Sequence, residues 1–304
     1  MEFLSHTASD YERALREVRS HHGGSVRIHA RYDRLEKGKN RCEIHYYLVG
    51  TKKQEEEDHA SDALATLIAA NDLPYSFIRP VEESLQNHNH SLLEREVEFR
   101  LLHHLFDNLR FKEEVREREI YVAGPAGSGK TTIAAKIARF LRLRGQKKIA
   151  LVEIGSSNDR LLRMLAHDCG VGFERVNDLD EIARLENYDH LIIDLGNIHD
   201  VVPLLSTLQA SSQLLVLVFG GSSKVSDMLA VTRLLPQRIQ AVLAFAKTDE
   251  THTLGNVLAL ANMANLPLFA FGEGASVAMG FSLANEQYIF SRLHGFTVEL
   301  SEFF

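Results

Sequence analysis

Cysteine is scarce in this sequence, which contains only Cys42 and Cys169 among its 304 residues. Two cysteines so far apart provide no metal-ligand spacing, and such low cysteine usage suits a reducing compartment. Long apolar runs are also missing, because none reaches the ~18 residues needed to span a bilayer. The first residues, MEFLSHTASDYERA, lack the basic-then-apolar order of a signal peptide. We therefore expect a cytoplasmic protein whose contact with a membrane is peripheral at most.

The sequence also lacks an excess of basic residues. Lys and Arg total 34 against 41 for Asp and Glu, which gives a net charge of -7 and a pI near 6.1. This balance argues against a broad nucleic-acid surface, so no DNA partner is expected. Hydrophobic residues at 45% and charged residues at 25% are ordinary values for a globular protein and exclude the disordered and fibrous classes.

Residue patterns divide the chain into three expected parts. Residues 1–50 predict a small α/β unit with a helix and two strands, in which Ser9 and Glu12 have the spacing of a capping box. Residues 51–118 begin with a charged linker or solvated helix start and continue as helices. The broad apolar face of these helices predicts a packed helical layer, with a partner-binding helix as the alternative.

From residue 119 to residue 304, short apolar segments alternate with helical or loop segments. This alternation predicts an α/β domain with a doubly wound parallel sheet and helices on both faces. Ligands of such folds sit beyond the carboxyl ends of the strands, and the chemically informative motifs of this sequence lie at those ends. The expected strands are 120–122, 149–152, 191–194, 214–219, 241–246 and 268–271.

The motif GPAGSGKT, residues 124–131, follows one of these strands and opens a helix. Its glycines let the main chain form a ring of N–H groups around phosphates, and the helix N-terminus adds positive charge. Lys130 is expected to reach the β- and γ-phosphates, and Thr131 to offer its hydroxyl to Mg²⁺. Lys136, further along the helix, is expected to face solvent or an acidic side chain. A plain glycine-rich turn is the alternative to a triphosphate site. The expected nucleotide-binding residues are Gly124, Pro125, Ala126, Gly127, Ser128, Gly129, Lys130, Thr131 and Thr132.

Two acidic residues at other strand ends extend this prediction. Asp194 follows the strand 191–193 and can hold Mg²⁺ through a water, with a capping role in the next segment as the alternative. Asp249, in the run Ala-Lys-Thr-Asp, can accept hydrogen bonds from N1–H and the N2 amino group of guanine, while the stem of Lys247 covers the base. Adenine lacks these donors, so Asp249 favours GTP over ATP.

Several runs resemble the motifs of a known family, the SRP-type GTPases. GPAGSGKTTIAAKIA is similar to the family's first nucleotide motif, and FAKTDETHTLGNVL is similar to its guanine motif. The run Phe-Gly-Glu-Gly at 271–274 looks like the family's closing loop near the base and ribose. The front of the chain, YERALREVRSHHGGSVRIHARYDR, resembles the small N-terminal domain of the branch that acts in flagellar placement. The resemblance adds Gly272, Glu273 and Gly274 to the expected nucleotide-binding residues, together with Lys247 and Asp249.

The resemblance implies a fold, cofactors and partners. The implied fold is a P-loop NTPase of the SRP-GTPase type, with a small α/β N-terminal domain at 1–50, a linker and helical N domain at 51–118 and a GTPase G domain at 119–304. The implied cofactors are GTP and Mg²⁺. The implied partners are a second copy of the chain, paired face to face when GTP is bound, and peripheral membrane or flagellar assembly proteins at the inner face of the cell membrane.

Two loops depart from the family pattern. After its second strand the family has D-T-Y-R, which supplies an Asp near Mg²⁺ and the attacking water, and an Arg near the phosphates. The run EIGSSN occupies that place here. Aligned without a gap, it has Gly155 where the family has the Asp and Asn158 where the family has the Arg, and Asp159 and Arg160 could substitute only if the loop shifts. Asp194 is followed by Leu-Gly-Asn, so the glycine that senses the γ-phosphate is missing or displaced. The candidate catalytic residues are Lys130, Asp194, Asp159 and Arg160.

These observations leave two functions open. A GTPase switch in flagellar placement or protein targeting, with weakened hydrolysis, is favoured by Asp249 and the closing loop. A non-hydrolysing nucleotide-bound scaffold, or pseudo-GTPase, is favoured by the two altered loops. An ATP-using P-loop enzyme such as a kinase is a weaker alternative, because Asp249 argues against adenine.

Overall fold

The computed structural model describes residues 4–22, 26–36, 39–48, 52–86, 93–155, 160–208, 213–236 and 238–303. The chain folds into two compact units. The first comprises Met1–Ala63 and Ser84–Glu94, and the second comprises Leu64–Glu83 and Arg95–Phe304. The division at residues 50 and 118 stays a prediction. Within the described ranges, no helix is both long enough and apolar enough to cross a membrane.

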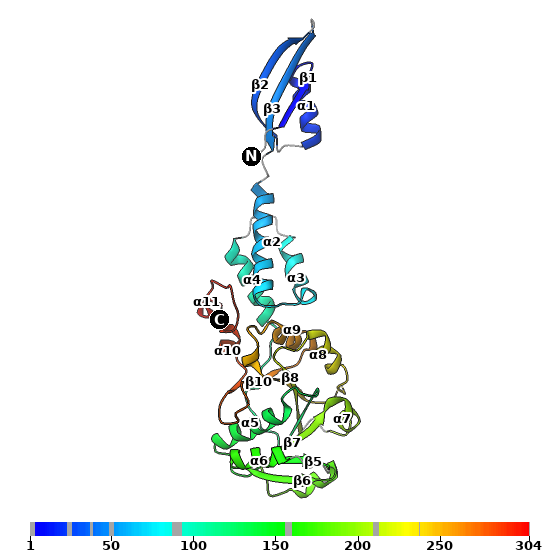
Figure 1. Ribbon diagram of the computed structural model, residues 1–304, viewed down its shortest axis with the longest axis vertical. Helices are drawn as coiled ribbons and strands as arrows, with labels where there is room; N and C mark the ends of the chain where they lie inside the picture. Colours follow the sequence, from blue (N-terminus) through cyan, green and yellow to red (C-terminus); the bar gives the residue numbers. More distant parts are fainter. Residues whose placement is uncertain are drawn as a thin grey trace. The chain divides into compact units, whose positions relative to one another are not determined.

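The first unit contains a three-stranded antiparallel sheet with strand order β1-β3-β2, and one helix, α1 (Figure 1). The helix packs on the sheet through Ala14 and Val18, which share a buried core with Cys42, Ile44 and Tyr46 of the third strand. These elements are β1 (Leu4–Ala8), α1 (Tyr11–His22), β2 (Val26–Glu36) and β3 (Lys39–Leu48). The expected helix and two strands are present, and β1 is an additional strand at the sheet edge.

The N-terminal cap of α1 differs from the expected one. The main-chain N–H of Arg13 donates to Asp10 Oδ1 at 2.8 Å, and Ser9 Oγ donates to Asp10 Oδ2 at 2.9 Å. Asp10 is therefore the N-cap, and the expected Ser9–Glu12 capping box is wrong. An ionised carboxylate is a stronger acceptor than a hydroxyl, which is the physical reason for this choice.

The second unit is built around an eight-stranded sheet with strand order β11-β10-β9-β8-β4-β7-β5-β6. Neighbouring strands are parallel except β11, which is antiparallel to β10. The six expected strands are confirmed, whereas β6 and β11 are additional; both are short and partly exposed and lack a continuous apolar run. The strands are β4 (Glu119–Gly124), β5 (Ile149–Ile154), β6 (Gly172–Val176), β7 (His190–Asn197), β8 (Gln213–Gly220), β9 (Ala241–Ala246), β10 (Leu268–Gly272) and β11 (Phe281–Leu283).

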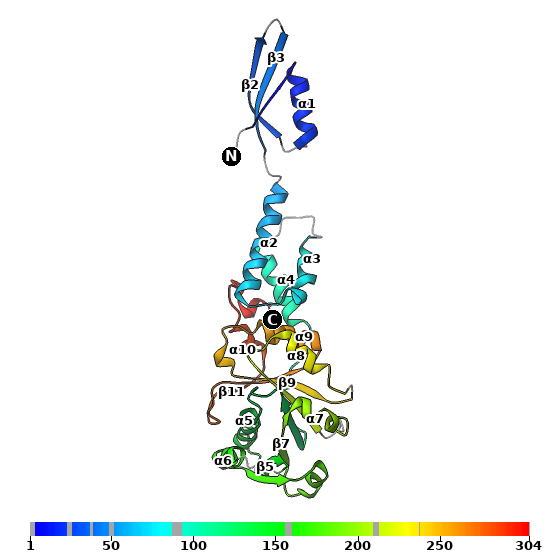
Figure 2. The same cartoon turned by 45° about the vertical axis from the view of Figure 1, so that its right-hand side comes forward.

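Helices cover both faces of this sheet, which is the doubly wound architecture that the sequence predicts (Figures 1 and 2). The helices are α5 (Lys130–Leu143), α6 (Arg160–Cys169), α7 (Ile198–Leu205), α8 (Val225–Thr232), α9 (Gly255–Ala264), α10 (Glu286–Phe290) and α11 (Leu300–Phe303). Helices α5 and α6 pack together over a buried core that includes Ile120, Val122 and Ile192. Helices α8 and α9 pack together on the opposite face.

Between the two sheets in the chain lie the helices α2 (Lys52–Ala70), α3 (Tyr75–Gln86) and α4 (Glu94–Phe106). The apolar stripe of α4 is fully buried at Val97, Leu101 and Leu105. Within the second unit, the side-chain amide of Asn262 on α9 donates to the carbonyl of Leu105 at 3.1 Å. The broad apolar face of α4 is therefore packed, as the sequence predicts.

Candidate functional site

The loop that joins β4 to α5 lies at the carboxyl edge of the sheet, on a strand flanked by β7 and β8. Gly129, just before α5, has a φ of +89°, and a Cβ at this position would lie 2.7 Å from Ala246 Cβ. Both the conformation and the close approach therefore require glycine. Ser128 is buried, and its Oγ has no hydrogen-bond partner within the described part of the chain. The first N–H groups of α5 and this hydroxyl together suit an anion such as phosphate.

Lys130, the first residue of α5, turns back over the loop. Its Nζ donates to the carbonyl oxygen of Pro125 at 2.8 Å. Burial lowers the pKa of the Lys130 amine, and the negative charge of Asp194 opposes this shift. The ammonium and the helix N-terminus therefore concentrate positive charge on one side of the loop.

Thr131 and Asp194 meet across the loop. Thr131 Oγ1 donates to Asp194 Oδ2 at 2.7 Å, and the N–H of Gly196 donates to Asp194 Oδ1 at 3.2 Å. Two oxygen ligands, one from α5 and one from β7, thus lie within hydrogen-bond distance of each other. Mg²⁺ prefers oxygen ligands and is commonly held by one or two side chains together with substrate phosphates. These residues fit such an ion.

Asp249 lies in η3 (Thr248–Glu250), the 3₁₀ turn that follows β9. Its Oδ1 accepts a hydrogen bond from the N–H of Gly274 at 2.9 Å. This bond lowers the pKa of the Asp249 carboxyl below its usual 3.8, so the group is ionised at neutral pH. A cavity of about 240 Å³ lies between this turn and α5, and Gly129 and Lys247 contribute to its lining. The cavity therefore carries a carboxylate acceptor beside the phosphate-type loop.

Lys136 does not face solvent or an acidic side chain, so that expectation is wrong. The residue is only 1% exposed, and its Nζ donates to three main-chain carbonyls. The acceptors are Glu273 at 2.6 Å, Met279 at 2.8 Å and Gly280 at 3.0 Å. Burial lowers the pKa of the Lys136 amine, and the charges of Asp249 and Glu273 oppose that shift. Three carbonyl dipoles replace water around the ammonium, and Lys136 thereby fastens residues 273–280 to α5.

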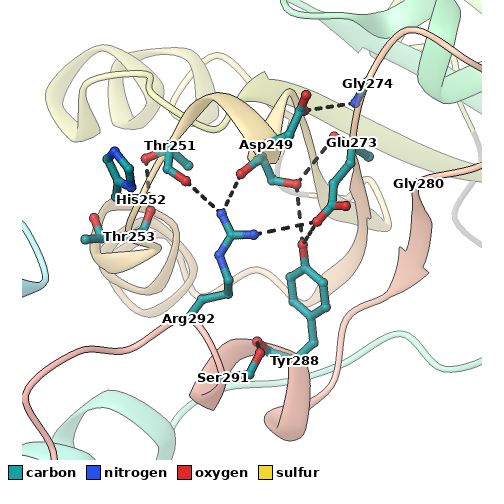
Figure 3. A network of polar contacts seen from close by, with 12 residues as sticks. Asp249, Thr251, His252, Thr253, Glu273, Gly274, Gly280, Tyr288, Ser291 and Arg292 are labelled. Atoms are coloured by element: carbon teal, nitrogen blue, oxygen red, sulfur yellow. Dashed lines mark hydrogen bonds and ion pairs between the residues drawn. The ribbon is translucent and has the colours of Figure 1, made fainter.

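A further group of side chains lies behind Asp249, as Figure 3 shows. Arg292 Nη2 donates to the carbonyls of Thr248 at 2.6 Å and Thr251 at 2.7 Å. Tyr288 Oη donates to Glu273 Oε1 at 2.7 Å. Arg292 and Tyr288 lie after the antiparallel strand β11, so they do not follow the end of a parallel strand, and neither belongs to a recognisable sequence motif. Sequence reasoning missed both residues because local pattern carried no signal for them.

Each of the two loops that depart from the family pattern contains a glycine with a positive φ. Gly155, after β5, has a φ of +90°, and Gly196, in β7, has a φ of +80°. An Asp at position 155 would adopt a strained left-handed conformation. Glu153, at the end of β5, is buried and forms an ion pair with Arg175 at 2.7 Å. Its carboxylate therefore already has a charged partner on β6.

Of the candidate catalytic residues, the structure brings Lys130 and Asp194 to the same loop. Arg160 begins α6 with an exposed side chain, and within the described ranges no hydrogen bond or ion pair joins it to that loop. Asp159 lies outside the described residues. The expected substitution for the family's Asp and Arg therefore stays a prediction.

Comparison with known proteins relates the chain to a group of GTPases. No family model matches it. The flagellar biosynthesis protein FlhF of Treponema pallidum is 23% identical over 265 residues, which cover 78% of this chain and 60% of that protein. The signal recognition particle 54 kDa protein of Pyrobaculum neutrophilum is 34% identical over 187 residues, which cover 55% of this chain and 42% of that protein. The chain thus spans less than two thirds of the length of these relatives.

A crystal structure of FlhF complexed with GTP and Mg²⁺ shares the fold. It superposes with a TM-score of 0.65 at 22% sequence identity, over 77% of this chain and 97% of that chain. The α/β fold with its large, mostly parallel sheet is therefore the fold of the SRP-type GTPases.

Proposed function

Because the chain is a divergent relative of the FlhF and SRP-type GTPases, we propose that it binds GTP with Mg²⁺ as a nucleotide-dependent switch in flagellar biosynthesis or protein targeting. One observation carries the proposal: two pairs of polar residues lie along the same edge of the sheet, and the loop of the first pair packs closely against the strand that leads to the second. Thr131 with Asp194 forms the first pair, and Asp249 with Gly274 forms the second. Gly129 packs against the end of β9 between them.

In this proposal, residues 124–132 hold the phosphates. The N–H groups of the loop and of the first turn of α5 donate to phosphate oxygens, as does the buried Ser128 hydroxyl. Lys130 exchanges its bond with the Pro125 carbonyl for the β- and γ-phosphate oxygens. Thr131 and Asp194 would hold Mg²⁺ with their side-chain oxygens. When bound, Mg²⁺ neutralises charge on the phosphate oxygens.

The guanine base would occupy the cavity beside Asp249. The Asp249 carboxylate accepts from N1–H and the N2 amino group, since its acceptor capacity exceeds the one bond from Gly274. The stem of Lys247 covers one face of the base. Gly272, Glu273 and Gly274 form the closing loop along the cavity, which Lys136 fastens to α5.

We further propose that this chain hydrolyses GTP slowly. Positioning and electrostatic stabilisation supply nearly all of the catalysis in phosphoryl transfer. Gly155 has no side chain to orient an attacking water, and Arg160 is exposed at the start of α6. In this proposal the phosphate-binding loop is kept, whereas Gly155 and the exposed Arg160 supply no side chain that orients the attacking water.

A binding assay with the full chain tests nucleotide choice. Displacement of a fluorescent guanine nucleotide should require roughly 100-fold more ATP than GTP, because adenine leaves Asp249 unpaired. Asp249→Asn should remove most of this preference for GTP, and Lys130→Ala should weaken the binding of both nucleotides alike. Equal affinity of the wild-type chain for GTP and ATP would show that the guanine assignment is wrong.

A single-turnover assay with excess protein separates the two remaining functions. A slow GTPase releases phosphate above the rate of GTP in buffer, and Lys130→Ala abolishes that excess. A pseudo-GTPase binds GTP with the same preference and shows no excess; the positive φ of Gly155 and Gly196 at the departing loops favours this alternative. Brisk hydrolysis would contradict both the slow-turnover proposal and the alternative.

A further inference from the structure

Arg292 connects the two loops that flank the proposed base cavity. Its side chain is 24% exposed, and its Nη2 donates to the carbonyls of Thr248 and Thr251. Its Nη1 lies 3.6 Å from Glu273 Oε1 in the closing loop. The two carbonyls stand on either side of Asp249 in sequence, as Figure 3 makes visible. One guanidinium therefore holds the turn that carries Asp249 from both ends.

Tyr288, four residues earlier, reinforces the same connection. Its ring stacks on Phe271 with centroids 4.6 Å apart and an interplanar angle of 14°. Its hydroxyl donates to Glu273 Oε1 and lies 3.4 Å from Thr248 Oγ1. The ring and the guanidinium thus join the closing loop to the Asp249 turn.

The segment that carries Arg292 is itself held firmly. The N–H of His294 donates to Asn71 Oδ1 at 2.8 Å, and Asn71 Nδ2 returns a bond to the His294 carbonyl at 2.9 Å. The N–H groups of Thr297 and Val298 donate to Glu98 Oε2. Arg292 is therefore anchored by buried polar side chains on its C-terminal side.

The Asp249 turn is short, and besides the buried Thr248, whose hydroxyl donates to the Gly272 carbonyl at 3.4 Å, contacts from outside the turn hold it. It is a 3₁₀ turn of three residues, preceded by Lys247 with a φ of +58°. Its internal main-chain bond runs from the N–H of Glu250 to the Lys247 carbonyl at 3.1 Å. A binding group must be held within roughly 0.5 Å of its productive position, so the placement of Asp249 depends on what supports this turn.

We propose that Arg292 is the positioning residue for guanine recognition: it holds Asp249 where the carboxylate accepts from both N1–H and the N2 amino group. The inference rests on the proposed GTP site and adds a residue that touches no nucleotide. Without the guanidinium, the turn relaxes and Asp249 keeps one of the two hydrogen bonds. Discrimination for the N2 amino group then falls more than affinity for the triphosphate.

The test uses inosine triphosphate, ITP, which differs from GTP by lacking the N2 amino group. We would measure the dissociation constants of both nucleotides by competition with a fluorescent guanine nucleotide. One hydrogen bond to a charged group predicts that the wild-type chain binds GTP roughly 10-fold or more tightly than ITP. Arg292→Met should reduce that ratio to about 3 or less, and Arg292→Lys, with a single donor group, should give an intermediate ratio.

The ratio of GTP to ITP affinity separates positioning from a merely structural role, because a general loosening of the site weakens the binding of both nucleotides equally. Arg233→Met, at the exposed end of α8, is the matched control and should keep the wild-type ratio. In an Asp249→Asn background, Arg292→Met should change the ratio no further, because the residue through which it acts is already altered. If Arg292→Met does not fold, Arg292→Lys and Tyr288→Phe decide, and both should lower the ratio.

A wild-type ratio in the folded Arg292 variants would overturn the inference, whether or not absolute affinities fall. An additive effect in the Asp249→Asn background would also overturn it. A wild-type chain that fails to bind GTP would instead overturn the proposed function, so the two failures are distinguishable.

Discussion

At the scale of single residues, the buried ammonium of Lys136 holds the closing loop through hydrogen bonds to main-chain carbonyls. We expect Lys136→Met to lower the free energy of unfolding by about 2 kcal/mol, because the carbonyls of Glu273, Met279 and Gly280 lose their common donor. Relief of the burial cost that lowers the lysine pKa offsets part of the loss. Urea unfolding at neutral pH measures the difference. The exposed Lys147→Met is the control, and equal values for the two variants would contradict this role.

Asp249 sets the pH dependence expected of base recognition. The Gly274 N–H lowers its pKa below 3.8, so the carboxylate and this contact persist above that value and are lost as pH falls through the lower native pKa. We expect the ratio of GTP to ITP affinity to stay constant from about pH 8 to about pH 5. Both nucleotides carry the same triphosphate, so its titration cancels in the ratio. A change of the ratio within this window would assign recognition to another titrating group.

At the scale of elements, the segment from Asn285 to Val298 ties the closing loop to the helices before the sheet. Glu98 on α4 is buried and accepts from the N–H and hydroxyl of Thr297 and from the N–H of Val298. We expect Glu98→Ala to cost about 3 kcal/mol, since buried donors are left unpaired. Thermal and urea unfolding would measure this cost, and hydrogen exchange at Val298 would locate it.

The matched control for Glu98 is Glu96 on the same helix. Glu96 forms an exposed ion pair with Arg100 at 3.3 Å, so Glu96→Ala should cost less than about 1 kcal/mol. Glu98→Gln should lie between the two variants, because its amide oxygen can still accept. A loss at Glu98 no greater than that at Glu96 would mean that the segment is held by other contacts.

At the scale of the whole molecule, the proposed switch requires a state that GTP favours over GDP. A ligand shifts an equilibrium only by its differential affinity for the two states. We expect the full chain to form a homodimer in the presence of GTP and to be monomeric with GDP or without nucleotide. Light scattering coupled to size exclusion measures the mass in each condition, with Asp249→Asn as the control that should stay monomeric. If the mass were the same in all three conditions, GTP-dependent dimerisation would be contradicted, whereas the proposal that the chain binds GTP would be unaffected.

The sequence by itself determined the sheet and the position of the glycine-rich loop before α5, because both depend on local pattern. Apolar runs of strand length mark β4, β5, β7, β8, β9 and β10, and glycine spacing marks the loop at 124–131. The same signal predicted Asp194 and Asp249 at one edge of the sheet, where Asp194 lies near the carboxyl end of β7 and Asp249 lies in the turn after β9; their roles stay predictions. The cap at Asp10 and the short strands β6 and β11 escaped prediction because their signals are weak or ambiguous.

The tertiary structure alone decided what supports the site. Lys136 meets carbonyls more than 130 residues away in the chain, and Arg292 meets carbonyls more than 40 residues away. Glu98 and Thr297 lie about 200 residues apart. Contacts of this kind depend on the path of the whole chain, whereas residue spacing reports only which neighbours share a face or a turn. Local sequence therefore specifies the groups that would touch a nucleotide, and packing specifies the groups that hold them in place.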